Sequence, residues 1–343
     1  MRRGSIVQLA ALAAVVAGGV TAVALAIPWL PSAASKERDR IDFVFWFTTG
    51  IAIFIFSIVA SLSIYAVVKF RARPDDDTDG PPIHGHTGLE IFWTAVPAAL
   101  VTAIAIVSGV VLTENGRAGR DPLRVEVVAQ QFAWSFTYEN DVAQGITSPL
   151  LYVPLHRHVQ LLITSKDVLH SFWVPEFGQK QDAVPGAINK LVITPNKLSP
   201  KGGFPVVCTE LCGLGHALMR SASIVLTPPA FEAWARKQKG GGGGPSPSGG
   251  NAGANVFQAQ GCGTCHTFAP AGSKGKIGPD LDKLSQYAQR AGKPLDQFVR
   301  ESIVNPDAYI ERGFPKGVMP KSFASLPKAQ LAALVSYLTK SKK

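Results

Sequence analysis

Two long apolar runs constrain this chain more than any other feature. Residues 43–70 and 89–112 are almost wholly apolar, and each is long enough to cross the hydrocarbon core of a bilayer. Backbone N–H and C=O groups find no water there, so such runs fold as helices. Pro97 fits inside the second run, because membrane helices accommodate proline. The sequence therefore predicts a transmembrane helical hairpin.

Charge orients this hairpin. Lys69, Arg71 and Arg73 surround the end of the first run, and lysine and arginine favour the cytoplasmic side. The turn is then cytoplasmic, and everything after residue 112 lies outside. With 46% hydrophobic and only 17% charged residues, the composition agrees with membrane segments attached to soluble parts.

An earlier apolar run, residues 6–30, follows a short basic start. Small residues at 31–35 resemble an export cleavage site, whereas the run itself is long enough to span a bilayer. We favour a cleaved signal over a retained helix and leave both open. The chain thus begins with residues 1–35, a signal peptide or extra N-terminal helix, followed by the hairpin at 36–120.

The next region, residues 121–238, has the pattern of a small antiparallel sandwich or barrel. Short runs rich in Val, Ile, Phe and Thr predict strands at 124–130, 132–138, 159–165 and 190–194. Residues 239–254 are rich in Gly, Ser and Pro and predict a flexible linker. Its reach of roughly 20–25 Å keeps the last domain close to the sandwich.

A tight group of sulfur and imidazole side chains occupies residues 206–219, at Cys208, Cys212, His216 and Met219. Thiolate, imidazole and thioether together select copper over magnesium, calcium or manganese. The whole chain has only three methionines and four cysteines. This concentration of sulfur therefore predicts a metal site.

Several interpretations of the two cysteines stay open at this point. Two thiolates are one more than a mononuclear blue-copper site uses, so the second could bridge a second metal. The pair could instead ligate one zinc ion, or form a disulfide outside the cell. His170 lies between two predicted strands, and it supplies a second imidazole if its strand end meets the loop.

The last region, residues 255–343, opens with Cys262-Gly-Thr-Cys265-His266. This is the covalent haem c attachment motif, in which two thiols add to the vinyl groups and the histidine ligates iron. A redox or zinc site is the alternative, but a second ligand pair is missing. Met319 is the only downstream methionine and the natural sixth ligand, as suits electron transfer. Predicted helices lie at 281–291, 295–304 and 328–339.

The formal charge of +10 raises the question of nucleic acid, anionic lipid or an acidic protein partner. Basic residues are dispersed rather than patterned with aromatics, so nucleic acid is excluded as a partner. In residues 252–343, thirteen Lys and Arg face six Asp and Glu. The last domain is therefore basic.

With these residues in hand, the chain resembles cytochrome c oxidase subunit II in its bacterial form with a fused cytochrome c, as in caa-type haem–copper oxidases. The loop Cys208-x-Glu210-x-Cys212-x-x-x-His216-x-x-Met219 and the segment 170–175 carry the resemblance. It implies a multidomain membrane protein: a transmembrane α-helical hairpin, then a cupredoxin-like β-sandwich, then an all-α class I cytochrome c.

The resemblance also implies a binuclear copper centre, Cu-A. Its ligands would be two bridging thiolates, two imidazoles, a thioether and one backbone carbonyl, from Cys208, Cys212, His170, His216, Met219 and Glu210. In that family the glutamate carboxylate at the Glu210 position holds magnesium at the border with subunit I.

Two further positions take a role from the resemblance. Glu90, in Glu-Ile-Phe-Trp-Thr, matches a glutamate at the entrance of a proton channel into subunit I. The family commonly has Gln-Trp-x-Trp where this chain has Gln131-Phe132-Ala133-Trp134, and the first Trp receives electrons from soluble cytochrome c. Phe132 fits a donor tethered in the same chain. Trp134 is a second electron-path candidate, or simply a buried aromatic.

The expected function is that of the electron-accepting subunit of a cytochrome c oxidase in a bacterial cell membrane, as a multi-pass protein. A cytochrome or a quinol–cytochrome c reductase would reduce haem c. Electrons would then pass from haem c to Cu-A and on to subunit I, where oxygen is reduced to water and protons are pumped. Subunits I and III and membrane lipid are the other expected partners. The rivals are a copper-delivery or thiol-redox protein and an electron carrier for another reductase. A quinol-oxidase subunit is disfavoured, because that branch lacks these copper ligands.

Overall fold

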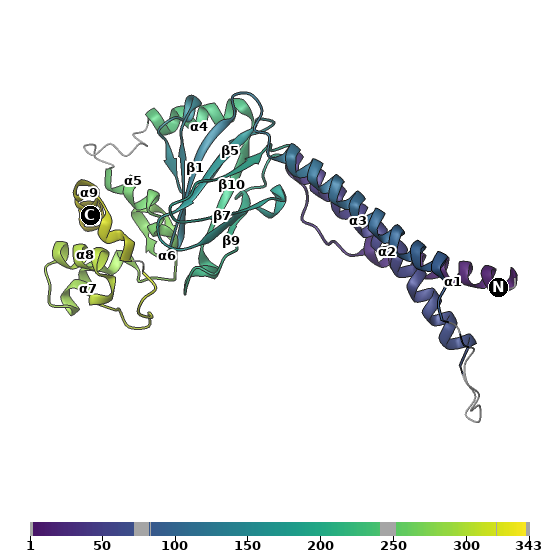
Figure 1. Cartoon of the computed structure of the whole chain (residues 1–343). Helices are drawn as coiled ribbons and strands as arrows, with labels where there is room; N and C mark the ends of the chain where they lie inside the picture. Colours follow the sequence, from purple (N-terminus) through teal and green to yellow (C-terminus); the bar gives the residue numbers. More distant parts are fainter. Residues whose placement is uncertain (1–2, 72–81, 83, 241–251, 320, 341–343) are drawn as a thin grey trace. The chain divides into compact units, whose positions relative to one another are not determined.

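A computed structural model describes residues 3–71, 82, 84–240, 252–319 and 321–340. The chain divides into two compact units (Figure 1). The first consists of Met1–Ser32 and Asp39–Glu114, and the second of Ala33–Arg38 and Asn115–Lys343.

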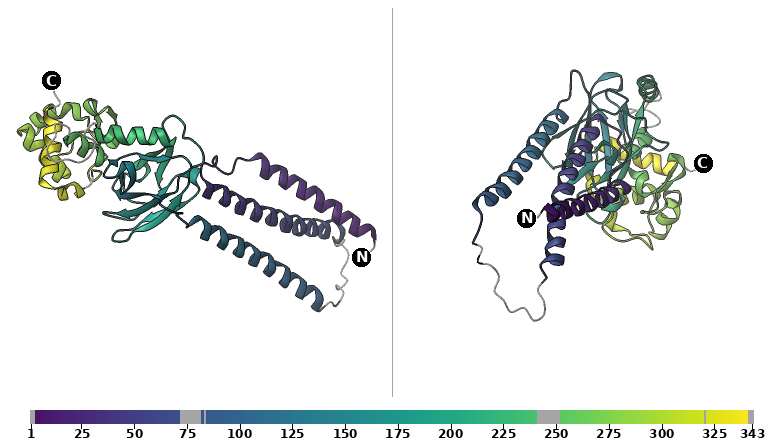
Figure 2. Two further views of the ribbon diagram at one scale, coloured as in Figure 1. Left: turned by 90° about the horizontal axis from the view of Figure 1, so that it is seen from above. Right: turned by 90° about the vertical axis from the view of Figure 1, so that its right-hand side faces the viewer.

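The first unit contains long apolar helices: α1 (Arg3–Ala26), most of α2 (Lys36–Lys69) and nearly all of α3 (Thr87–Asn115). Figure 2 shows them as extended rods. Each is long and apolar enough to cross a membrane, and α2 and α3 form at the two runs predicted to span it. Helix α1 forms over the earlier apolar run, which both interpretations of that segment allow.

Helix α2 begins before the apolar run, at Lys36. The Ser35 hydroxyl accepts the Arg38 N–H at 3.0 Å, which satisfies one of the unpaired donors of the first turn. The Glu37 carboxylate accepts the N–H and the hydroxyl of Thr194 at 2.7 and 2.8 Å. These bonds explain why the charged segment ahead of the apolar run is helical.

The second unit begins with a sandwich of two five-stranded sheets. One sheet contains, in spatial order, β3 (Thr147–Ser148), β2 (Ala133–Tyr138), β1 (Leu123–Gln130), β5 (Val159–Ser165) and β8 (Asn189–Ile193). The other contains β4 (Leu151–Pro154), β10 (Arg220–Leu226), β9 (Phe204–Cys208), β6 (His170–Trp173) and β7 (Lys180–Ala183).

The predicted sandwich is confirmed, but its strands are not all antiparallel as expected. Strand β1 runs parallel to β5, and β4 runs parallel to β10. The chain leaves the first sheet after β3, contributes β4 to the other sheet and returns as β5. Neighbours reached by such a crossover, rather than by a hairpin, can run in the same direction.

The core of the sandwich is aromatic. Along β5 every second side chain is buried, as expected of a strand with one face on a core. The Trp134 ring meets the Phe172 ring edge-on, with centroids 5.5 Å apart at 85°. Edge-to-face packing is a favoured aromatic geometry, and it places the Trp134 ring beside His170, the first residue of β6.

Helix α4 (Pro228–Gly240) follows the last strand and was not predicted. Phe231, Trp234 and Ala235 share one face, and the Trp234 ring stacks on Tyr152 at 4.3 Å between centroids. Their i, i+3, i+4 spacing is an amphipathic-helix pattern. Of the predicted linker, residues 239–240 belong to α4 and 252–254 to α5, whereas 241–251 lie outside the described residues.

The C-terminal region is helical, as predicted. Its helices are α5 (Ala252–Ala259), α6 (Cys262–Cys265), α7 (Leu284–Arg290), α8 (Leu295–Val304) and α9 (Lys328–Lys340). A small ribbon pairs β11 (Thr267–Phe268) with β12 (Ser273–Lys274). Helices α5 and α9 cross so closely that a Cβ at Gly253 would collide with the Ala333 carbonyl oxygen. This crossing closes one side of a second apolar core.

Candidate functional site

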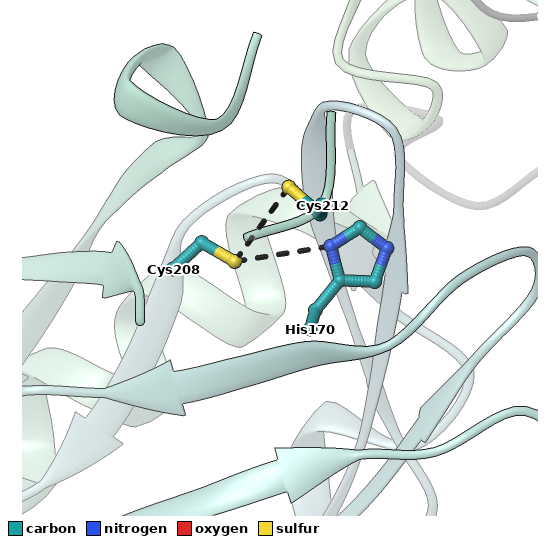
Figure 3. Close-up of side chains that lie close together, drawn as sticks. All are labelled: His170, Cys208 and Cys212. Atoms are coloured by element: carbon teal, nitrogen blue, oxygen red, sulfur yellow. Dashed lines mark hydrogen bonds between the residues drawn. The ribbon is translucent and has the colours of Figure 1, made fainter. Parts of the chain in front are cut away.

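The sulfur and imidazole side chains singled out in the sandwich converge at one end of a sheet. His170 begins β6 and Cys208 ends β9, two neighbouring antiparallel strands. The connection from β9 to β10 carries Cys212, His216 and Met219. Figure 3 shows the two sulfur atoms and one ring nitrogen of His170 facing one another.

The spacing of these donor atoms suits shared metal ions. Cys208 Sγ lies 3.8 Å from His170 Nδ1 and 3.9 Å from Cys212 Sγ. Cys212 Sγ lies 3.6 Å from His216 Nδ1 and 3.8 Å from Met219 Sδ. Two ligands on one tetrahedral metal at 2.0–2.3 Å would be about 3.3–3.8 Å apart. The residues therefore fit metal ions held between them, and the soft donor set favours copper.

The donor side chains are shielded from solvent on the side of the sandwich core. His170 and Met219 are fully buried, and Cys208 and Cys212 are nearly so. The Glu210 carbonyl oxygen lies 3.3 Å from Cys208 Sγ, so it faces the same space. The rest of Glu210 is exposed, which leaves its carboxylate outside the sulfur cluster.

The two thiols differ electrostatically. Burial alone would raise the pKa of Cys208, but hydrogen bonding with His170 and with backbone N–H groups outweighs it, and the pKa is lowered. For Cys212, burial and the nearby Cys208 charge both raise the pKa. Between these two pKa values, the metal-free pair therefore carries one negative charge.

His170 is held by a carboxylate that the sequence analysis missed. Its Nε2 lies 2.8 Å from Asp167 Oδ1. Burial alone would lower the pKa of His170, yet the bonds with Asp167 and Cys208 raise it overall. Metal-ligating histidines usually bond a carboxylate or carbonyl through the second ring nitrogen. The sequence did offer a signal for this bond, because Asp167 stands only three residues before the candidate ligand His170.

The aromatic candidates occupy different places. Phe132 packs on the metal loop, since a Cβ added at Gly215 would lie 2.5 Å from its ring. Beside it, Gln131 Nε2 donates to the Cys212 carbonyl oxygen at 2.5 Å. Trp134 is buried in the core, with its ring centroid 6.2 Å from that of His170. Its Nε1–H finds no hydrogen-bond partner among the described residues.

The Cys-x-x-Cys-His segment lines a cavity in the C-terminal region. Cys262 and Cys265 lie on α6, and His266 follows it. His266 Nδ1–H donates to the Pro279 carbonyl oxygen at 2.7 Å, so Nε2 is left as the free ligand atom. Burial lowers the pKa of His266, which favours the neutral imidazole that binds a metal.

The walls of this cavity suit an apolar macrocycle. Met319 lines it together with the Cys-x-x-Cys-His side chains. The remaining walls are largely apolar, from residues such as Leu284, Phe298, Val299, Ile303, Phe323 and Leu338. An apolar pocket carrying two thiols, an imidazole and a thioether fits covalently attached haem with His/Met ligation.

The sandwich contributes to the same cavity. Gln131, Phe132 and Ala133, at the turn between β1 and β2, are among its lining residues. Gln130 Nε2 lies 3.3 Å from Gln260 Oε1, across the contact between the two regions. Phe132 therefore packs on the metal loop and also lines the cavity that the Cys-x-x-Cys-His segment lines.

Glu90 lies in the first turn of α3 and is exposed. Its Oε1 accepts the His86 N–H at 3.1 Å, and His86 Nδ1 accepts the Leu89 N–H at 3.1 Å. This reciprocal pair resembles a capping box. The carboxylate thus has a local structural partner at the start of α3.

Comparison with known families agrees with each region. The pattern for cytochrome c oxidase subunit II, periplasmic domain, matches residues 146–226. The transmembrane domain of the same family matches residues 22–111. A cytochrome c family matches residues 251–342.

Curated relatives extend the match. Cytochrome c oxidase subunit 2 of Synechocystis sp. is 33% identical over 252 residues, covering 60% of this chain and 74% of the relative. The protein of the same name from Alkalihalophilus pseudofirmus is 29% identical, covering 82% of this chain and 81% of the relative. That of Bacillus subtilis is 30% identical, covering 80% of each. The chain therefore belongs to the cytochrome c oxidase subunit 2 family.

Proposed function

We propose that this subunit accepts electrons at a covalent haem c and passes them through a binuclear Cu-A centre to subunit I. The observation that carries the proposal is the convergence of sulfur and nitrogen donors, 3.6–3.9 Å apart, from β6, the end of β9 and the β9–β10 loop. Bound there, copper supplies a one-electron relay, and oxygen reduction with proton pumping belongs to subunit I.

The chain's own residues set the conditions for that relay. Cys208 and Cys212 would hold the two copper ions through their thiolates, together with the imidazoles of His170 and His216. Met219 and the Glu210 carbonyl would complete the set. These side chains come from a hydrogen-bonded strand pair and a short loop, which would limit the movement of the ligands when an electron arrives. Burial of Met219 and His170 excludes water from one side of the site.

The second cofactor would be held by the α6 segment. Cys262 and Cys265 would hold the haem through thioether links, and His266 and Met319 would ligate its iron. Phe132 supports a short route between the two centres, because it packs on Gly215 and also lines the cavity. Trp134 is a weaker candidate for the route, since it contributes to the packed core beside His170.

Two carboxylates complete the proposal at the boundary with subunit I. The exposed side chain of Glu210 would hold magnesium there, beside its copper-facing carbonyl. Glu90 would lie at the cytoplasmic opening of a proton path. Both roles come from the family resemblance.

The proposed partners are subunits I and III and an external donor such as a cytochrome or a quinol–cytochrome c reductase. The basic C-terminal domain favours an acidic donor surface. The proposed setting is a bacterial cell membrane, crossed more than once, with the sandwich and the cytochrome domain on the outer side. Lys69 and Arg71, at the end of α2, favour that orientation.

A copper-delivery or thiol-redox protein is the competing function. Such a protein needs accessible thiols, whereas Cys208 and Cys212 are 8% and 3% exposed. Metal analysis of the purified full-length chain, with visible and near-infrared spectra, separates the two. We expect two copper ions and one iron per chain, with absorption from both centres. A chain with labile copper, or with copper but no haem, would contradict the proposal.

A further inference from the structure

We infer that Asp167 is a positioning residue of the copper centre, and that its carboxylate braces a copper ligand and the turn beside Phe132 as one bonded unit. The inference rests on the proposed copper site. It concerns a residue that is not itself a ligand and lies in the loop between β5 and β6.

One carboxylate oxygen sets the orientation of the imidazole. Asp167 Oδ1 lies 2.8 Å from His170 Nε2. An ionised carboxylate only accepts hydrogen bonds, so Nε2 carries the proton. The opposite nitrogen, Nδ1, faces Cys208 Sγ at 3.8 Å, and in the neutral imidazole that binds a metal it is the unprotonated atom. Asp167 thereby selects both the tautomer and the ring orientation that metal binding requires.

The other carboxylate oxygen holds a different part of the chain. Asp167 Oδ2 accepts the Gln131 backbone N–H at 2.7 Å. Gln131 in turn donates its side-chain N–H to the Cys212 carbonyl oxygen at 2.5 Å. An unbroken series of hydrogen bonds, called the circuit below, therefore runs from His170 through Asp167 and Gln131 to Cys212. It joins the strand that carries one ligand to the loop that carries another.

The chemistry of the group is specific to a carboxylate. Oδ1 also accepts the Val168 N–H at 2.7 Å and lies 3.3 Å from the Ser165 hydroxyl. Both oxygens therefore face donors. An asparagine has one accepting oxygen and one donating NH₂ group, so Asp167→Asn must give up either the Gln131 bond or the bonds at His170 and Val168.

A purely structural role is the alternative, because the Ser165 and Val168 bonds also shape the loop. The two roles differ in what they change. A loop-shaping residue would lower the thermal stability of the sandwich without altering the copper centre. A positioning residue would alter the copper spectrum and copper retention even where the fold is intact.

The test uses the full-length, metal-loaded chain in its membrane complex, as wild type, Asp167→Asn and Asp167→Ala. Asp182→Asn is the matched control: it removes the same charge from β7, where Asp182 Oδ1 accepts the Ser171 hydroxyl at 2.8 Å. The readouts are the near-infrared band and copper hyperfine pattern, the rate of copper loss to a cuprous chelator, and haem c absorption.

We expect both Asp167 variants to change the copper spectrum, with weaker copper retention by about 10–100-fold for Asp167→Ala and less for Asp167→Asn. The haem spectrum should not change, and Asp182→Asn should match wild type. Gln131→Ala keeps the bond between Asp167 and His170 but removes the side-chain bond to the Cys212 carbonyl oxygen. We therefore expect faster copper loss than in wild type, with a smaller spectral change than in the Asp167 variants.

Wild-type copper spectra and retention in all three circuit variants would overturn the inference. If Asp167→Ala fails to accumulate, Asp167→Asn and Gln131→Ala decide on the same readouts. A wild-type chain that binds no copper pair would instead overturn the proposed function, so the two failures are distinguishable.

Discussion

The Phe132 ring occupies the space that a side chain at Gly215 would need: a Cβ there would lie 2.5 Å from the Phe132 Cδ2 atom. The metal loop and the turn between β1 and β2 are therefore fitted to each other. Phe132 is only 7% exposed, so the ring has little room to move aside.

Gly215→Ala should consequently destabilise the loop by about 1–3 kcal/mol, because the added methyl group overpacks the contact. Thermal unfolding of the full-length chain in detergent measures this. The same substitution in a Phe132→Leu background should cost less, because the smaller side chain leaves space. Equal costs in the two backgrounds would show that the contact is not close in solution.

Met219→Leu tests the thioether ligand. The two side chains have similar volumes, and such core exchanges usually cost less than about 1.5 kcal/mol. Met219 is fully buried with its sulfur 3.8 Å from Cys212 Sγ. We expect a changed near-infrared copper spectrum and slower oxidase turnover, with haem c absorption unchanged. An unaltered copper spectrum would refute the ligand assignment.

Copper loading of the metal-free chain should depend on pH in a defined direction. Hydrogen bonding lowers the pKa of Cys208 overall, and burial raises that of Cys212. Between these two pKa values only Cys212 holds a proton, so binding both thiolates releases about one proton from the pair. Below the lowered pKa of Cys208 both thiols are protonated, and about two are released.

Apparent copper affinity should therefore fall as pH falls, and fall more steeply below the pKa of Cys208. Competition with a chelator of known affinity at each pH checks this, together with proton release in weak buffer. His216→Asn is a useful comparison, because it removes an imidazole and leaves both thiols. Affinity that is independent of pH would mean that both thiolates exist before metal arrives.

Glu90 can be tested for proton uptake apart from its capping bond. Its Oε1 accepts the His86 N–H, and the amide oxygen of Glu90→Gln can accept the same bond. Proton uptake needs an ionisable group, so Glu90→Gln should slow turnover in the assembled oxidase while α3 keeps its start. Glu90→Ala serves as the variant that loses both properties. Full turnover in Glu90→Gln would restrict Glu90 to the helix cap.

Local sequence patterns determined much of this protein. The apolar runs required helices, because lipid offers no partner for backbone groups, and α2 and α3 formed over them. The cysteines, histidine and methionine of residues 208–219 are close in sequence, so a single tight loop gathers them. The same holds for Cys262, Cys265 and His266 on and beside α6.

Only the tertiary structure decided how the ligand side chains are oriented. Which ring nitrogen of His170 faces the thiols depends on Asp167, and Asp167 is held by Gln131, 36 positions away in the chain. Gln131 reaches Cys212 across 81 positions. The parallel pairing of β1 with β5 likewise depends on a crossover through the other sheet. Hydrogen bonds between distant segments follow the path of the folded backbone, and residue type and spacing do not encode that path locally.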